Sequence, residues 1–250
     1  MSTLFYLSSA QMDVIRPFFP RSRDIPRKDD QKIISGIIYV LKFGLRWKDV
    51  PKEYGPYKTL YNRFVRWSNM GVFKKIFTAL SESTQDTSLL MIDATYLKAH
   101  RTAASLRKKA SSRCIGRTKG GLNTKLHVVC DSDGRPIRTL LTAGTISDYG
   151  GAAYLLPTLP STRMLLADRG YDAGWIRSFL KNRGCTPCIP SRKNAKSQEY
   201  YDKKQYRQRH KIEHMFSRLK DWRRIATRYD RCAHTFLSAI HLAAIVIFYL

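Results

Sequence analysis

The chain has 250 residues, which allows one sizeable core and a small second domain, because single domains usually run to about 100 to 200 residues. Its 45 Lys and Arg against 19 Asp and Glu give a formal net charge of +26, spread along the whole length and far beyond what solubility requires. Nucleic acid is the partner that fits this charge best, because binding is strengthened by the counterions released when Lys and Arg contact phosphates. Ribosomal and membrane-surface proteins can be similarly basic.

Residues 1–82 are predicted to form a small all-α domain. Ser8 and Gln11 fit a capping box at the start of a helix. Isoleucine and leucine then recur at helical spacing over 33–41, and Gly44 is expected to end that helix.

A turn at 47–56 leads into a helix in which basic residues alternate with apolar ones. This arrangement resembles a helix-turn-helix, while an ordinary helical bundle with a solvated basic face fits the spacing equally well. In the first interpretation the helix contacts DNA through Lys58, Arg63 and Arg66.

Polar residues at 81–88 predict a linker, and a second domain is expected over 89–250. Its predicted strands cover 89–92, 125–130, 137–141, 164–167 and 185–190, with helices near 154–159 and 173–183. The turn at 131–134 joins the second and third of these strands in a hairpin. Three successive strands followed by alternating helix and strand indicate an α/β fold: a ribonuclease-H-like mixed sheet flanked by helices.

The apolar segment 234–250 is predicted to be a buried closing helix, since polar residues interrupt it and leave it too short to span a bilayer. We expect no membrane segment. The start of the chain also lacks the pattern of a secretory signal, so a cytoplasmic protein with reduced cysteines is expected. Cys185 and Cys188 form a lone C-x-x-C without a second pair at zinc spacing, which favours structural thiols.

The segment between Asp93 and Asp131 contains no acidic residue and is predicted to be a flexible basic loop. Its nine basic residues are Lys98, Arg101, Arg107, Lys108, Lys109, Arg113, Arg117, Lys119 and Lys125. Such a run is usually only a solvated surface, but one that follows a carboxylate-bearing strand is placed to hold phosphates. We therefore expect Lys119 and Lys125 to contact DNA.

Asp93 and Asp168 each follow a predicted buried strand, where open α/β sheets place their ligand sites. One such Asp is more often a loop cap or an ion-pair partner, but two in parallel positions favour a shared site. Asp172 remains an alternative to Asp168. Carboxylates suit Mg²⁺, which keeps several waters and can support phosphodiester cleavage and transfer.

A third carboxylate comes from a helix that starts near Asp202. A helix turns by about 100° per residue, so one arc of roughly 60° around its axis contains Tyr206, Arg209, Glu213 and Lys220. Apolar residues occupy the adjoining face, so Glu213 is expected at the border between packed and polar surface. Periodicity alone fits an exposed polar stripe equally well.

The pattern Tyr206-x₂-Arg209-x₃-Glu213-x₆-Lys220 matches the Y-R-E-K signature in every residue type and spacing. The chain thereby resembles the DDE transposases of bacterial insertion sequences. The segments most similar to the insertion-sequence-five group are IDATYLKAH around Asp93, KGGLNTKLH from Lys119, ADRGYD around Asp168, and RRIATRYDR with IHLAA near the end. The resemblance covers residues 35–250.

This resemblance implies that Asp93, Asp168 and Glu213 are catalytic and bind two Mg²⁺ ions, with Mn²⁺ as a substitute. It also implies that Arg209 and Lys220 contact DNA, with Tyr206 beside them. The expected reaction is cleavage at the ends of an insertion sequence by activated water, followed by transfer of the 3′-hydroxyl ends to target DNA. Because two terminal repeats must be paired, we expect a homo-oligomer on double-stranded DNA in the bacterial cytoplasm, at the nucleoid.

Three alternatives stay open from the sequence. A catalytically silent copy would keep the helical domain and the charge and act as a DNA-binding inhibitor. A nuclease of the same fold would cleave without joining. A zinc metalloprotease is suggested by the H-x-x-E-H pattern from His210 to His214, but no Glu follows His214 to complete that site.

Overall fold

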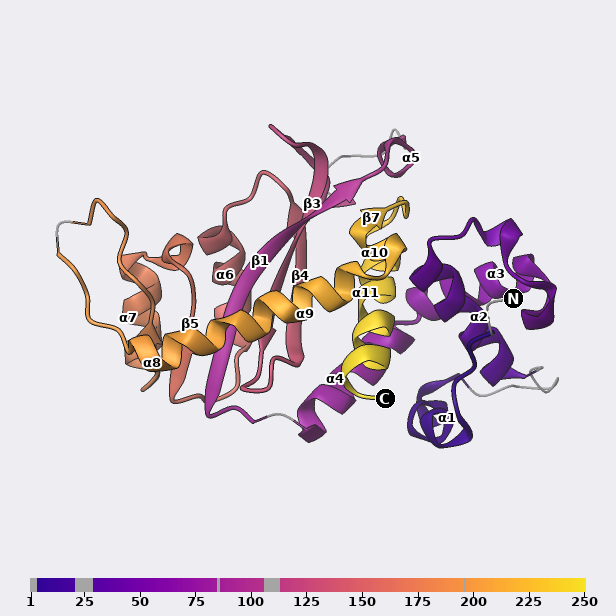
Figure 1. Cartoon of the computed structure of the whole chain (residues 1–250), viewed down its shortest axis with the longest axis horizontal. Coiled ribbons are helices and arrows are strands. Elements are labelled where there is room, and N and C mark those ends of the chain that lie inside the picture. Colours follow the sequence, from indigo (N-terminus) through magenta and orange to yellow (C-terminus); the bar gives the residue numbers. More distant parts are fainter. Residues whose placement is uncertain (1–3, 21–28, 85, 106–112, 196) are drawn as a thin grey trace.

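A computed structural model describes residues 4–20, 29–84, 86–105, 113–195 and 197–250. A group of helices from the first third of the chain lies at one end of the molecule, and a mixed sheet with its own helices forms the rest (Figure 1). The predicted α/β class, with an all-α part ahead of the sheet, is confirmed.

The helical region contains α1 Ser9–Ile15, α2 Asp30–Phe43, α3 Tyr57–Asn69 and α4 Val72–Thr84. The capping box is present, because Ser8 Oγ accepts from the backbone of Gln11 and the Gln11 side chain accepts from the backbone of Ser8. Gly44 ends α2 in the left-handed conformation, with a φ of 75° that a glycine adopts without strain. Two short 3₁₀ turns, Trp47–Asp49 and Lys52–Tyr54, precede α3.

The sheet has seven strands: β1 Leu89–Ala99, β2 Gly116–Thr118, β3 Gly121–Cys130, β4 Pro136–Ala143, β5 Met164–Leu166, β6 Thr186–Cys188 and β7 Thr227–Arg228. Its main order is β2-β3-β1-β5-β6, with β4 paired to β3 and β7 paired to β1. Strand β1 is antiparallel to β3 and parallel to β5, so the sheet is mixed. The predicted hairpin is confirmed as β3 and β4.

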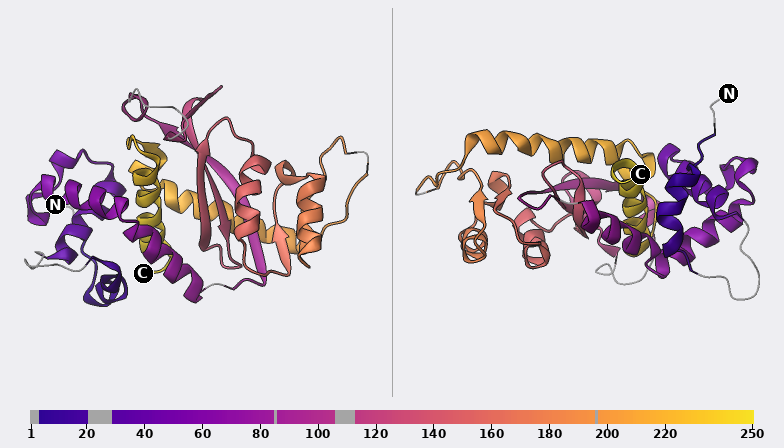
Figure 2. Two further views of the ribbon diagram at one scale, coloured as in Figure 1. Left: turned by 180° about the vertical axis from the view of Figure 1, so that it is seen from behind. Right: turned by 90° about the horizontal axis from the view of Figure 1, so that it is seen from below.

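Helices cover both faces of this sheet (Figure 2). They are α6 Asp148–Leu155 and α7 Gly174–Asn182 on one face and α9 His210–Lys220 on the other. Shorter helices are α5 Arg101–Ala104, α8 Lys203–Tyr206 and α10 Arg223–Ala226, and α11 Ala233–Phe248 is the predicted closing helix. None of the described helices is long and apolar enough to cross a membrane.

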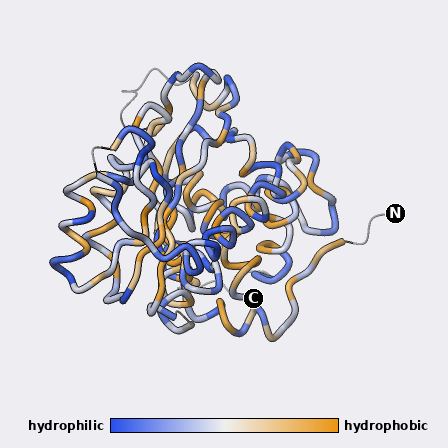
Figure 3. Tube along the Cα trace, turned by 60° about the vertical axis from the view of Figure 1, so that its left-hand side comes forward, coloured by the Kyte–Doolittle hydropathy of each residue, from blue (hydrophilic) through white to orange (hydrophobic). Residues whose placement is uncertain are grey.

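The apolar run at the start of β1 is buried on both sides because successive side chains point to opposite faces. Leu90 and Ile92 belong to the core under α6 and α7, whereas Leu89 and Met91 belong to the core under α9 and α11. Across the whole molecule, hydrophobic segments gather in the interior, while hydrophilic segments lie mostly at the periphery (Figure 3).

The second of these cores extends without interruption into the helical region. Helix α11 packs against α2, α3, α4 and α9, so residues from the end of the chain complete the core of its first third. The division into 1–82 and 89–250 therefore stays a prediction.

Four predicted segments differ in the structure. The helix expected near 154–159 begins earlier, as α6, because Ser147 caps it, and only the 3₁₀ turn Leu156–Thr158 follows. The polar segment 81–88 is not all linker, because α4 continues to Thr84. Strand β1 does not end at Ile92 but runs through Asp93 to Ala99, because its second half pairs with β3. The predicted basic loop is consequently shortened by β1, α5, β2 and β3, while Arg107, Lys108 and Lys109 lie outside the described residues.

Candidate active site

Asp93 and Asp168 lie on neighbouring parallel strands. The register pairs Leu90 with Leu165 and Met91 with Leu166, so the same step along both strands reaches the two aspartates. Asp168 follows the end of β5 and accepts a 2.8 Å hydrogen bond from the backbone N–H of Gly170. The sequence prediction that these two residues share one place in the sheet agrees with this register.

The carboxyl of Asp93 is held in a largely buried position. Burial raises its pKa to about 6; the guanidinium of Arg209 and a hydrogen bond from Ala94 oppose this shift, while the nearby charges of Asp168 and Asp148 add to it. A carboxylate in such surroundings favours a positively charged partner.

Arg209 supplies that partner and joins Asp93 to Glu213. Its Nη2 lies 3.3 Å from Asp93 Oδ2, and its Nη1 lies 2.6 Å from Glu213 Oε1. The side chain of Arg209 is 14% exposed, whereas that of Glu213 is 58% exposed. One guanidinium therefore connects a buried carboxylate on β1 with a solvent-facing carboxylate on α9.

The other two residues of the four-residue pattern, Tyr206 and Lys220, lie on either side of Arg209 and Glu213 along the chain. Lys220 donates a 2.6 Å hydrogen bond from Nζ to Thr95 Oγ1 on β1. Tyr206 ends α8, and its ring meets Tyr201 at 5.3 Å with an interplanar angle of 75°. The pattern thus begins at the end of α8, passes through the 3₁₀ turn Arg207–Arg209 and continues along α9, where Arg209 and Lys220 contact β1.

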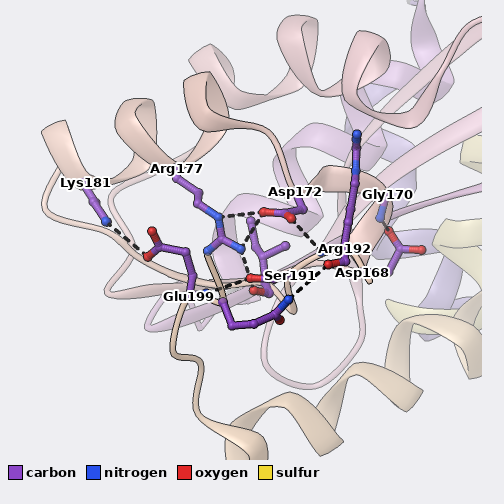
Figure 4. Close-up of polar contacts among 10 residues, drawn as sticks. Asp168, Gly170, Asp172, Arg177, Lys181, Ser191, Arg192 and Glu199 are labelled. Carbon is purple, nitrogen blue, oxygen red and sulfur yellow. Dashed lines mark hydrogen bonds and ion pairs between the residues drawn. The ribbon is translucent and has the colours of Figure 1, made fainter. Parts of the chain in front are cut away.

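Asp172, the alternative to Asp168, is engaged elsewhere. It forms a 2.8 Å ion pair with Arg177 and accepts from the backbone of Arg192 (Figure 4). Although burial acts to raise its pKa, these hydrogen bonds lower it overall. Figure 4 shows Asp172 turned toward Arg177 and Asp168 turned toward Gly170. Asp172 and Arg177 thereby connect α7 to the segment that follows β6.

The expected DNA contacts have different surroundings. Lys58 and Arg66 on α3 are exposed, as is Lys119 in the turn between β2 and β3. Arg63 is tied within the helical region, because it pairs with Asp30 at 2.8 Å and lies over the ring of Trp67.

Lys125 differs from the expectation of an exposed contact. Its side chain is only 5% exposed, and its Nζ lies 2.9 Å from Asp148 Oδ1. In this arrangement the ammonium neutralises an acidic residue of the protein and does not face outward. Sequence reasoning missed Asp148, whose only local signal is its place in the first turn of α6 after the cap Ser147.

A family model described as "Transposase DDE domain" matches residues 84–248. The chain belongs to this DDE transposase family. A second model, described as "Putative transposase of IS4/5 family", matches residues 7–77 and extends the match into the helical region.

Among relatives of this transposase, the Brucella ovis "Putative transposase for insertion sequence element IS6501" is 36% identical over 127 residues, which is 50% of this chain and 98% of that protein. A Burkholderia cepacia "Putative transposase for insertion sequence element IS402" is 29% identical over 141 residues, covering 49% of this chain and 64% of that one. The piggyBac transposase in a synaptic complex with hairpin DNA aligns with a TM-score of 0.51 at 11% identity, covering 93% of this chain and 69% of that one, which supports the shared fold.

Membership of the DDE family implies use of a divalent metal, and the side chains of this transposase fit one. The donors are carboxylates, the ligands that hard cations prefer. Two buried polar atoms near them, Arg209 Nε and Tyr171 Oη, have no hydrogen-bond partner within the described chain. No three His, Cys, Asp or Glu side chains of the described residues are already gathered around one point, so bound waters would complete the coordination.

Proposed function

We propose that this transposase binds the terminal inverted repeats of an insertion sequence, cleaves the DNA there and transfers the 3′-hydroxyl ends to target DNA. The observation that carries the proposal is the link from Asp93 through Arg209 to Glu213, beside the strand end that bears Asp168. Arg209 thus contacts acidic residues of β1 and α9 and lies within electrostatic reach of Asp168 at the β5 end, and this excess of negative charge suits divalent cations that would in turn hold phosphates.

The carboxylates of Asp93, Asp168 and Glu213 would hold two Mg²⁺ ions, with Mn²⁺ as a substitute. Such ions activate water and stabilise charge on the attacking and leaving oxygens of an in-line phosphoryl transfer. Arg209 is the residue placed to contact a DNA phosphate at this point, because its guanidinium already lies between two of the carboxylates. Lys220 and Tyr206 extend this contact along the helix.

The helical region 1–82 is proposed to bind the repeats, with the exposed Lys58 and Arg66 facing the phosphates and Lys119 adding a contact from the sheet. Two copies would pair the two ends. Cleavage and strand transfer would take place at the bacterial nucleoid.

The test incubates the purified protein with Mg²⁺ and labelled terminal DNA, and compares the wild type with Asp93→Asn, Asp168→Asn and Glu213→Gln. Each variant is expected to lose at least about a hundredfold in cleavage rate, because a metal-binding carboxylate is removed. Asp133→Asn is the matched control, since the side chain of Asp133 is exposed and pairs with Arg135. Full cleavage by a carboxylate variant would remove that residue from the site, and cleavage without joined products would favour a nuclease.

A further inference from the structure

Asp148 is an acidic residue that lies beside Asp168 and within electrostatic reach of Asp93, without belonging to the Y-R-E-K pattern. It stands in the first turn of α6, after the cap Ser147, and Lys125 of β3 donates to its Oδ1. The Lys125 ammonium is buried and also lies 4.6 Å from the centre of the Tyr96 ring. Asp148, whose side chain is 36% exposed, is therefore tied to an ammonium that is itself buried.

The other oxygen of Asp148 points toward the same space as Asp168. A methyl group built on Gly170 would lie 3.4 Å from Asp148 Oδ2 and 2.9 Å from Asp168 Oδ1. Both carboxylates thus border the small volume that the missing side chain of Gly170 leaves open. Asp148 also lies within electrostatic reach of Asp93.

Tyr171 gives independent evidence that something binds among these carboxylates. Its side chain is 1% exposed, and its hydroxyl has no hydrogen-bond partner in the described part of the chain. Burial raises the pKa of this phenol well above its usual range, and the charges of Asp93, Asp148 and Asp168 raise it further. The hydroxyl is buried, lies within electrostatic reach of three carboxylates and has no hydrogen-bond partner among the described residues. Such a group indicates a place for a water or an ion-bound water.

We propose that Asp148 is a fourth carboxylate of the catalytic centre and contributes to divalent-metal binding there, with Tyr171 as hydrogen-bond donor to a water on the bound ion. The proposal rests on the proposed function. In it, Lys125 offsets the negative charge of Asp148, which lowers the repulsion between the centre and DNA phosphates at some cost in affinity for the metal.

The experiment measures Mn²⁺ binding by calorimetry on the full chain without DNA. Asp148→Asn is expected to weaken Mn²⁺ binding about tenfold to a hundredfold, the range found when partners of a metal site are removed. Lys125→Met is expected to tighten it, because Asp148 then keeps its full charge. Asp133→Asn, which removes an exposed carboxylate, is the control and is expected to bind Mn²⁺ like the wild type.

Asp148→Asn leaves Lys125 as a buried charge without its partner, which could weaken metal binding by repulsion or disturb the fold. The double variant Lys125→Met/Asp148→Asn removes both charges and keeps the net charge of the wild type. We expect it to bind Mn²⁺ as weakly as Asp148→Asn. Wild-type affinity in the double variant would overturn the proposal, because the loss in the single variant would then come from the stranded lysine.

Tyr171→Phe is a second measurement that keeps the ring and removes only the hydroxyl. It is expected to weaken Mn²⁺ binding severalfold without loss of thermal stability, because the buried hydroxyl has no partner in the protein to lose.

Failure of this inference is distinguishable from failure of the proposed function. If Asp93→Asn and Asp168→Asn lose Mn²⁺ binding and cleavage while Asp148→Asn matches Asp133→Asn, only the fourth carboxylate is refuted. If Asp93→Asn and Asp168→Asn retain both properties, the metal-dependent function itself fails, and the inference with it.

Discussion

Arg209 and Asp93 form an ion pair of 3.3 Å although 116 positions separate them in the sequence. Since Arg209 also contacts Glu213, it holds α9 and β1 at one fixed separation. A planar guanidinium can reach two carboxylates at once, whereas an ammonium is a single point charge.

Arg209→Lys is therefore expected to reduce DNA cleavage at least about tenfold, because lysine cannot maintain both contacts. The measurement is the rate of cleavage of labelled terminal DNA at saturating Mg²⁺. Arg207→Lys provides the control, since Arg207 is exposed and lies two positions before Arg209. Equal rates for the two variants would show that the double contact is not needed.

Gly170→Ala is expected to abolish most cleavage while preserving the fold. The added Cβ would lie 2.9 Å from Asp168 Oδ1, closer than real side-chain contacts allow, so the Asp168 carboxylate must turn away. Cleavage rate and thermal midpoint are measured together. The comparison is Gly174→Ala, where a Cβ meets nothing within 4 Å, and a normal rate for Gly170→Ala would mean that the orientation of Asp168 is unimportant.

Two arginines on α3 are expected to affect different properties. Arg66→Ala should weaken DNA binding and reduce the slope of log affinity against log salt by about 1, because Arg66 is exposed and available to one phosphate. Arg63→Ala should instead lower stability by about 1 to 2 kcal/mol, because it breaks the pair with Asp30 and the contact with Trp67. Filter binding at several salt concentrations and urea unfolding separate the two effects, and identical behaviour of both variants would contradict this assignment.

Stability is expected to fall as the pH drops below about 6.5, because His241 is buried in its neutral form. Burial lowers its pKa to about 3, its ring stacks on Phe77 at 4.7 Å, and its Nε2 lies 2.8 Å from Thr139 Oγ1. Between the unfolded and folded pKa values only the unfolded chain takes up the proton, so acid favours unfolding.

Between about pH 6.5 and about pH 5, protonation of His241 in the unfolded chain should lower the free energy of unfolding by about 2 kcal/mol. Urea unfolding across that range measures it. His241→Gln should reduce the dependence without abolishing it, because burial also lowers the pKa of His127, to about 4. His210→Gln, which changes an exposed ring, should leave it unaltered.

The predictable parts of the fold depend on local chemistry. The capping box at Ser8 and the end of α2 at Gly44 were predictable because the interacting groups lie within a few residues. The hairpin of β3 and β4 follows from the turn at 131–134 in the same way. In the site, the spacing of Arg209 and Glu213 on one helix predicted their shared side, which their 2.6 Å contact bears out.

Other features depend on partners that spacing does not reveal. Lys125 looked like one more basic residue of a surface loop, but its strand turns it inward to Asp148, which lies 23 positions away. Asp148 was not singled out from the sequence, because its only local signal is its place in the first turn of α6. Asp93 was expected at a strand end, yet the strand continues because β3 supplies hydrogen bonds for its second half. Each difference arises from pairing between distant segments.

The packing of α11 among α2, α3 and α4 also bears on the order in which the chain folds during synthesis. Domains usually fold as they leave the ribosome, beginning from the N-terminus. Here the first helices cannot bury their apolar faces fully until Ala233–Phe248 has been made, because Phe236, Ile240 and their neighbours fill the same core. A nascent or truncated product that ends before α11 would expose that surface, so the fully packed helical region would arise only from a chain translated through its last helix.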